Sequence, residues 1–115
     1  MATPYLEPVA KIGRQFVEDN GIQVLDLKWL GKAGFDIAEV SKDALYHLVK
    51  AVDRPESEAI FISCTTLHTI ELIKFLEADL QKPVITSNQA TFWNMLRLAG
   101  VNDRIEGFGQ LLERF

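Results

Sequence analysis

The residue types best suited to chemistry lie in a short hydroxyl-rich stretch around the only cysteine of the chain, Cys64, which is followed by Thr65 and Thr66. Residues 59–62, just before it, form an apolar run typical of a strand buried on both faces of a parallel sheet. Residues 67–79 have helical spacing, so Cys64 is predicted to lie where a strand turns into a helix. Unpaired N–H groups and the positive end of the helix dipole favour ionisation of a thiol there, and would also stabilise a bound carboxylate.

A simpler interpretation is that Cys64 is a buried structural residue, which is the more common state of a lone free cysteine. His68, one helical turn further on, could reach the sulfur or could simply be solvated. The sequence around Cys64 leaves both interpretations open.

The remaining pattern alternates helices with short apolar strands, which predicts an α/β fold with an open, mainly parallel sheet flanked by helices in three layers. Strands are expected at 22–30, 59–62 and 83–86, and the strand before the first helix is absent or reduced to residues 1–2. Two helices are expected in the first half, one at 3–19 with Thr3 as N-cap and Pro4 at the first position, and one at 42–52 capped by Ser41. Further helices are expected at 67–79, at 89–99 capped by Ser87-Asn88, and briefly within 109–115.

Ligands of open α/β sheets bind where the carboxyl ends of the strands meet helix starts. The corresponding stretches here are residues 3–5, 31–41, 63–66 and 86–89, which supply a thiol, a phenol (Tyr5), hydroxyls and an amide (Asn88). They contain no strong base, no metal-ligand cluster and no phosphate-binding glycine loop. Such a lining suits a small anionic substrate held by neutral donors, although ordinary helix capping explains Ser87 and Asn88 equally well.

Composition narrows the function classes. A chain of 115 residues with 48% hydrophobic residues predicts one domain, residues 1–115. The net charge of −4 and pI near 5.1 argue against nucleic-acid binding. No apolar run approaches the length that spans a bilayer, so no membrane partner is expected. A single cysteine and the lack of a signal-peptide pattern favour a reducing cytoplasm.

Three stretches, at 61–69, 82–90 and 92–100, together resemble the second half of the maleate cis-trans isomerase and arylmalonate decarboxylase group of the aspartate/glutamate racemase superfamily. The opening Ala-Thr-Pro-Tyr, residues 2–5, is similar to the motif that begins this half. The resemblance runs through nearly the whole chain in order.

The resemblance implies cofactor-free chemistry beside a carboxylate, in a cleft between two similar lobes that each present one reactive position. Cys64 matches the second-lobe cysteine, and Tyr5 matches a tyrosine that contacts a substrate carboxylate. The N–H groups around Thr65 and Thr66 would hold another carboxylate, and Ser87 and Asn88 would complete the pocket wall. The implied partner is a small carboxylate or dicarboxylate, with no cofactor and no metal.

Two departures from the group's pattern bear on function. Thr66 and His68 stand where isomerases usually carry asparagine and arginine, and the first lobe with its own reactive position is missing. The chain is therefore expected to act as an incomplete isomerase, racemase or decarboxylase lobe, closest to maleate isomerase, that joins a second copy or a complementing lobe. The alternative is a catalytically degenerate or partner-binding domain that retains the fold.

Overall fold

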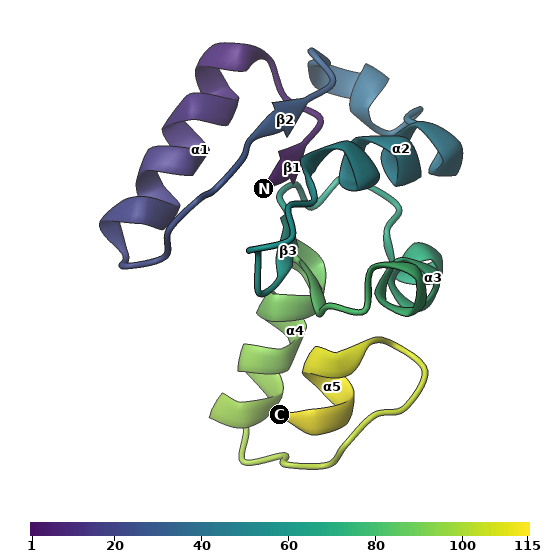
Figure 1. Ribbon diagram of the computed structural model, residues 1–115. Helices are drawn as coiled ribbons and strands as arrows, with labels where there is room; N and C mark the ends of the chain where they lie inside the picture. The colour runs from purple at the N-terminus through teal and green to yellow at the C-terminus, as the bar shows by residue number, and fades with distance from the viewer.

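The computed structural model describes residues 1–115 and contains one sheet of four parallel strands in the order β2-β1-β3-β4 (Figure 1). The strands are β1 (Ala2–Thr3), β2 (Lys28–Trp29), β3 (Ile60–Ile62) and β4 (Val84–Thr86). The predicted α/β class with a parallel sheet is confirmed. The strand before the first helix, which the sequence predicts to be absent or reduced to residues 1–2, is present as the two-residue strand β1. It lies in the middle of the sheet, where it pairs with β2 and β3.

The helices are α1 (Glu7–Asp19), α2 (Lys42–Val52), α3 (Ile70–Leu80), α4 (Ser87–Leu98) and α5 (Gln110–Arg114), with a 3-10 turn η1 (Gly34–Ile37). The strand order places β2 on one side of β1, and β3 and β4 on the other. Because parallel crossovers are right-handed, α1 covers one face of the sheet and α2 and α3 the other. Figure 1 shows α1 and the α2–α3 pair on opposite sides of the strands. No helix in this fold has the length and apolar character needed to cross a membrane.

The hydrophobic core lies between the sheet and the α2–α3 pair. Ile60 and Ile62 point into it, among residues such as Leu45, Val49 and Leu76, and all are almost fully buried. Phe61, whose side chain points to the opposite face, is only half-buried. The prediction of a strand buried on both faces is therefore wrong for the α1 face, which is less completely covered.

The predicted start of the first helix, Thr3 with Pro4, is also wrong. Thr3 is completely buried as the last residue of β1, and α1 begins at Glu7 after Leu6. Backbone pairing on both sides of a central strand outweighs the local preference of a Thr-Pro pair for a helix start. The helix packs through Ala10, so the apolar stripe of Leu6, Val9, Ile12 and Phe16 faces outward.

Three other boundaries differ from the sequence-based expectation. The strand expected over 22–30 is restricted to Lys28–Trp29, and α3 begins at Ile70 rather than at residue 67. The cap of α4 is Thr86, whose side chain accepts from the Gln89 N–H in a capping box, so Ser87 is the first helical residue. The predicted cap Ser41 is confirmed, since its hydroxyl accepts from the Ala44 N–H at 3.1 Å.

The C-terminal segment is fastened to the sheet through a buried carboxylate. Glu77 of α3 accepts N–H groups from Val84 at 2.9 Å and from Gln110 at 2.9 and 3.1 Å. Gly109 has φ of 92°, and a Cβ atom there would lie 2.4 Å from Cγ2 of Ile73. Leu112 is buried, whereas the ring of Phe115 lies in solvent.

Candidate active site

Cys64 lies two residues beyond the end of β3, in a strained backbone conformation. It is 4% exposed and has φ of 135°, a region that non-glycine residues rarely occupy. Such a conformation costs about 1–3 kcal/mol and persists only where the surroundings enforce it, most often at functional sites. Part of that enforcement is visible, because the Cys64 N–H donates to Oγ of Ser87 at 3.2 Å.

The sulfur is approached by a backbone donor from its own loop. The Thr66 N–H donates to Sγ of Cys64 at 3.4 Å. Residues 65–67 form a bend and α3 begins only at Ile70, so the helix predicted from residue 67 starts later than expected. The backbone donor to the sulfur is thus a loop N–H. The helix start that contacts this loop is that of α4, through Ser87.

Tyr5 supplies a second donor from the end of β1. The neighbouring Cys64 side chain is the largest cause that raises the pKa of Tyr5 to about 12, followed by burial and the negative charge of a Cys64 thiolate. The phenol therefore stays protonated at neutral pH and can donate to the sulfur.

The loops around these two residues are held by further hydrogen bonds. Nδ2 of Asn88 donates to the Thr65 carbonyl at 2.9 Å, which ties the Cys64 loop to α4. The Gly31 and Lys32 N–H groups donate to the carbonyls of Tyr5 and Pro4 at 3.2 and 2.7 Å, which ties the loop after β2 to the end of β1.

The structure thus brings the predicted site residues to one edge of the sheet. Tyr5, Cys64 and Ser87 are in contact, and Asn88 holds Thr65. The side chains of Thr65, Thr66 and Asn88 are exposed there. His68 is also exposed. The positive φ of Cys64 and the proximity of Tyr5 to Cys64 were not predicted, because no local sequence pattern indicates either feature.

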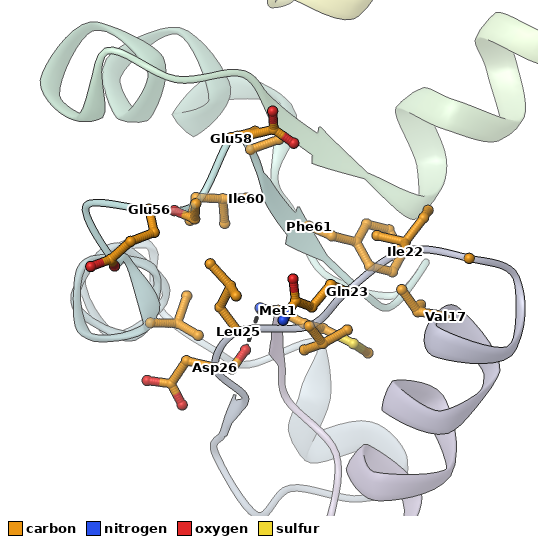
Figure 2. Close-up of a pocket in the computed structure, with 15 residues that line it drawn as sticks. Met1, Val17, Ile22, Gln23, Leu25, Asp26, Glu56, Glu58, Ile60 and Phe61 are labelled. Atoms are coloured by element: carbon orange, nitrogen blue, oxygen red, sulfur yellow. Dashed lines mark hydrogen bonds between the residues drawn. The ribbon is translucent and has the colours of Figure 1, made fainter.

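Two cavities of the molecule lie away from Cys64. Neither the cavity of about 560 Å³ near Met1 (Figure 2) nor that of about 140 Å³ beside Phe75 includes Cys64. No group of three or more His, Cys, Asp or Glu side chains is arranged to hold a metal ion. The chemistry available at this edge is that of a thiol, a phenol, hydroxyls, an amide and backbone N–H groups.

Comparisons with known proteins point to one family. A family model described as arylmalonate decarboxylase matches residues 1–112. The arylmalonate decarboxylase of Bordetella bronchiseptica is 32% identical over 98% of this chain and 49% of its own length. The maleate isomerase of Alcaligenes faecalis is 25% identical over 96% of this chain and 44% of its own length. The chain spans about half the length of the curated relatives it matches.

Solved structures agree in fold. A double mutant of arylmalonate decarboxylase in a liganded form superposes with a TM-score of 0.91 at 28% identity, over 98% of this chain and 50% of that one. A maleate isomerase variant from Pseudomonas putida S16 with maleate superposes with a TM-score of 0.91 at 26% identity. The match covers 96% of this chain and 45% of that one. These matches confirm the family resemblance noted in the sequence. The chain belongs to the arylmalonate decarboxylase family.

Proposed function

We propose that this chain is one lobe of a cofactor-free enzyme in which Cys64 acts on a carbon beside a carboxylate, and that its reaction is the decarboxylation of a substituted malonate. The observation that carries the proposal is the Cys64 sulfur itself, which two donors approach, Tyr5 and the Thr66 N–H, while the backbone is held at a positive φ. The 32% identity to a decarboxylase supports this choice of reaction. The chain also has a single cysteine, and a decarboxylation needs only one proton donor.

In the proposed decarboxylation, Cys64 supplies the proton that replaces the lost carboxylate. The bond between the α-carbon and one carboxylate breaks, carbon dioxide leaves, and the electron pair stays on the α-carbon as an enediolate with the other carboxylate. The Cys64 S–H gives its proton to that carbon. The resulting thiolate is stabilised by the Tyr5 O–H and the Thr66 N–H until it takes a proton from water.

The retained carboxylate needs donors that do not compete for the reacting proton. The exposed hydroxyls of Thr65 and Thr66 and the amide of Asn88 lie on the same edge as the sulfur. Ser87 positions Cys64 through the Cys64 N–H and completes this side of the pocket. A dicarboxylate bound by neutral donors is the substrate class that such a lining suits.

A second candidate reaction, maleate isomerisation, is favoured by the relative from Alcaligenes faecalis and by the Pseudomonas structure with maleate. Here Cys64 would act as the thiolate from the start. Its sulfur adds to one alkene carbon, the double bond becomes a single bond that can rotate, and the carbon–sulfur bond then breaks. The two donors to the sulfur serve this reaction as well.

The proposed site also needs a second wall, because the chain spans about half the length of its relatives. We infer that a second lobe supplies it, either another copy of this chain, which would bring a second Cys64, or a complementing lobe. A domain that keeps the fold without catalysis is the competing possibility.

The test is turnover of an aryl-substituted malonate and of maleate, followed by NMR, together with the oligomeric state from light scattering. Cys64→Ser is expected to abolish turnover, whereas Asn94→Ser, an exposed change on α4, is expected to leave it unchanged. Iodoacetamide should alkylate Cys64 faster at pH 7 than a free thiol of pKa about 8.5. Slow alkylation that needs denaturant, with no turnover, would identify a non-catalytic domain; fast alkylation without turnover would indicate a missing second lobe.

A further inference from the structure

Gln89, in the first turn of α4, is a polar residue that is only 3% exposed. Its side-chain amide is bonded at both ends to backbone groups that lie far apart in the chain. Oε1 accepts the N–H of Thr86 at 3.4 Å, and Nε2 donates to the carbonyl of Phe108 at 2.6 Å. Because a buried amide or carbonyl without a partner is costly, these bonds fix the start of α4 against the segment that precedes α5.

The start of α4 is also the part of the fold that holds Cys64. The Gln89 N–H donates to Oγ1 of Thr86 at 3.1 Å, which together with the Oε1 contact completes a capping box. Ser87 lies between the two partners of this box, and its Oγ accepts the Cys64 N–H at 3.2 Å. A displaced Ser87 would remove this acceptor, and Cys64 keeps its φ of 135° only while its surroundings enforce it.

The segment that Gln89 bonds is fastened a second time, by a different residue. A Cβ atom at Gly109 would lie 2.9 Å from Nε2 of Gln89, so the backbone packs closely on the amide. The next residue, Gln110, donates its N–H to the Glu77 carboxylate of α3 at 2.9 Å. Glu77 therefore holds the same segment without taking part in the capping box, and it provides a control for Gln89.

We propose that Gln89 is a positioning residue of the Cys64 site. Its side chain holds the capping box of α4, and through Ser87 it keeps Cys64 in the conformation that the proton transfer needs. Gln89 does not itself touch Cys64 or a substrate. The consequence for catalysis rests on the proposed function, whereas the effect on the Cys64 backbone can be measured without any turnover.

Two substitutions of similar length separate positioning from fastening. Gln89→Glu keeps an acceptor for the Thr86 N–H, as glutamate does in a capping box, but has no N–H to donate to the Phe108 carbonyl. Gln89→Met supplies neither group. Both variants should therefore unfold at a lower temperature, since each loses the bond to Phe108, but only Gln89→Met should release Ser87.

The experiment is hydrogen exchange of the Cys64 amide, followed by NMR on the full chain. Exchange should be about tenfold faster in Gln89→Met, as expected for one lost hydrogen bond, and close to the original rate in Gln89→Glu. Ser87→Ala removes the acceptor itself and sets the size of the full effect. The Ile60 N–H, which donates to the Pro83 carbonyl at 2.9 Å, reports loosening of the whole sheet, so each Cys64 rate is compared with it.

Glu77→Gln is the matched control, because it weakens the second fastening and leaves the capping box intact. Unchanged Cys64 exchange in Gln89→Met would overturn the proposal. Equal acceleration in Gln89→Met, Gln89→Glu and Glu77→Gln would also overturn it, since Gln89 would then only fasten the C-terminal segment.

Turnover provides the second readout. Misplacement of the reacting sulfur should lower kcat about tenfold in Gln89→Met and leave KM unchanged, with most of kcat restored in Gln89→Glu. An unchanged kcat in Gln89→Met would overturn the catalytic part of the proposal. The expected exchange pattern in a chain that turns over no substrate would support the positioning of Cys64 by Gln89 and count against the proposed reaction alone.

Discussion

The two edges of the sheet differ in what they leave unsatisfied. At the Cys64 edge the loops are tied together by hydrogen bonds, and polar groups gather around one nearly buried sulfur. At the Met1 edge a cavity of about 560 Å³ has both apolar and polar side chains in its lining, the polar ones being Gln23, Asp26, Glu56, Ser57 and Glu58. The first edge thus concentrates polar groups on one reactive side chain, whereas the second distributes them around a cavity.

Their electrostatics differ in the same way. The Cys64 contacts come from neutral groups, Tyr5, Ser87 and a backbone N–H. Near the Met1 edge, Lys82 bonds Asp53 at 2.8 Å, and Arg54 pairs with Asp26. These ion pairs hold the loop before β3 in place, whereas the groups that contact Cys64 are neutral donors and acceptors.

The largest effect is expected at the Cys64 edge. Cys64→Ser should lower turnover by about 10²–10⁴-fold, the contribution of a positioned acid or base. Ile22→Glu, an exposed change beside the cavity at the Met1 edge, should leave turnover unchanged. Steady-state kinetics on both variants check this, with circular dichroism to verify the fold. If Ile22→Glu loses turnover while remaining folded, the two edges are not independent.

A smaller effect is expected from Tyr5→Phe. Removing a hydrogen bond to a charged group costs about 1.5–3 kcal/mol, and the lower end applies because Tyr5 is only half-buried, so turnover should fall roughly tenfold. Cys64→Ser should in turn lower the Tyr5 pKa from about 12 toward 10, since the sulfur contact is its largest cause. Ultraviolet titration of tyrosinate in a Tyr46→Phe background measures this pKa; an unchanged value would remove the Tyr5–Cys64 contact from the site.

The smallest effect belongs to Met1. Its ammonium has a pKa of about 6 in the folded chain against an ordinary value of 8.0, so the unfolded chain holds the extra proton between these values. Stability should therefore rise with pH from about 6 to 8. Thermal unfolding of the 115-residue chain across this range is the measurement. An N-terminally acetylated chain should lose that rise, and a rise of equal size in both forms would show that another group is responsible.

Much of this arrangement can be predicted from the sequence, because it follows from local patterns. Ser41 marks a helix start, residues 59–62 and 83–86 mark strands, and strand ends in a parallel sheet meet at one edge. That reasoning places Tyr5, Cys64 and Ser87 near one another before any coordinates are known.

What could not be predicted depends on tertiary pairing. Thr3-Pro4 has the local preference of a helix start, yet β2 and β3 hold Thr3 in the sheet. Cys64 adopts a positive φ in a loop that Ser87, 23 residues away in the chain, helps to hold. The outward stripe of α1 is apolar by sequence and would be assigned to the core by periodicity alone.

The close approach at Gly109 has a practical consequence for handling the protein. A methyl group there would collide with Ile73, and a chain shortened before this residue would leave the Glu77 carboxylate buried with fewer donors. Affinity tags therefore belong after Phe115, where the terminal ring already meets water. Limited proteolysis followed by gel electrophoresis can check a preparation before either edge is assayed. Cleavage ahead of Gly109 would indicate that the C-terminal segment has detached from α3.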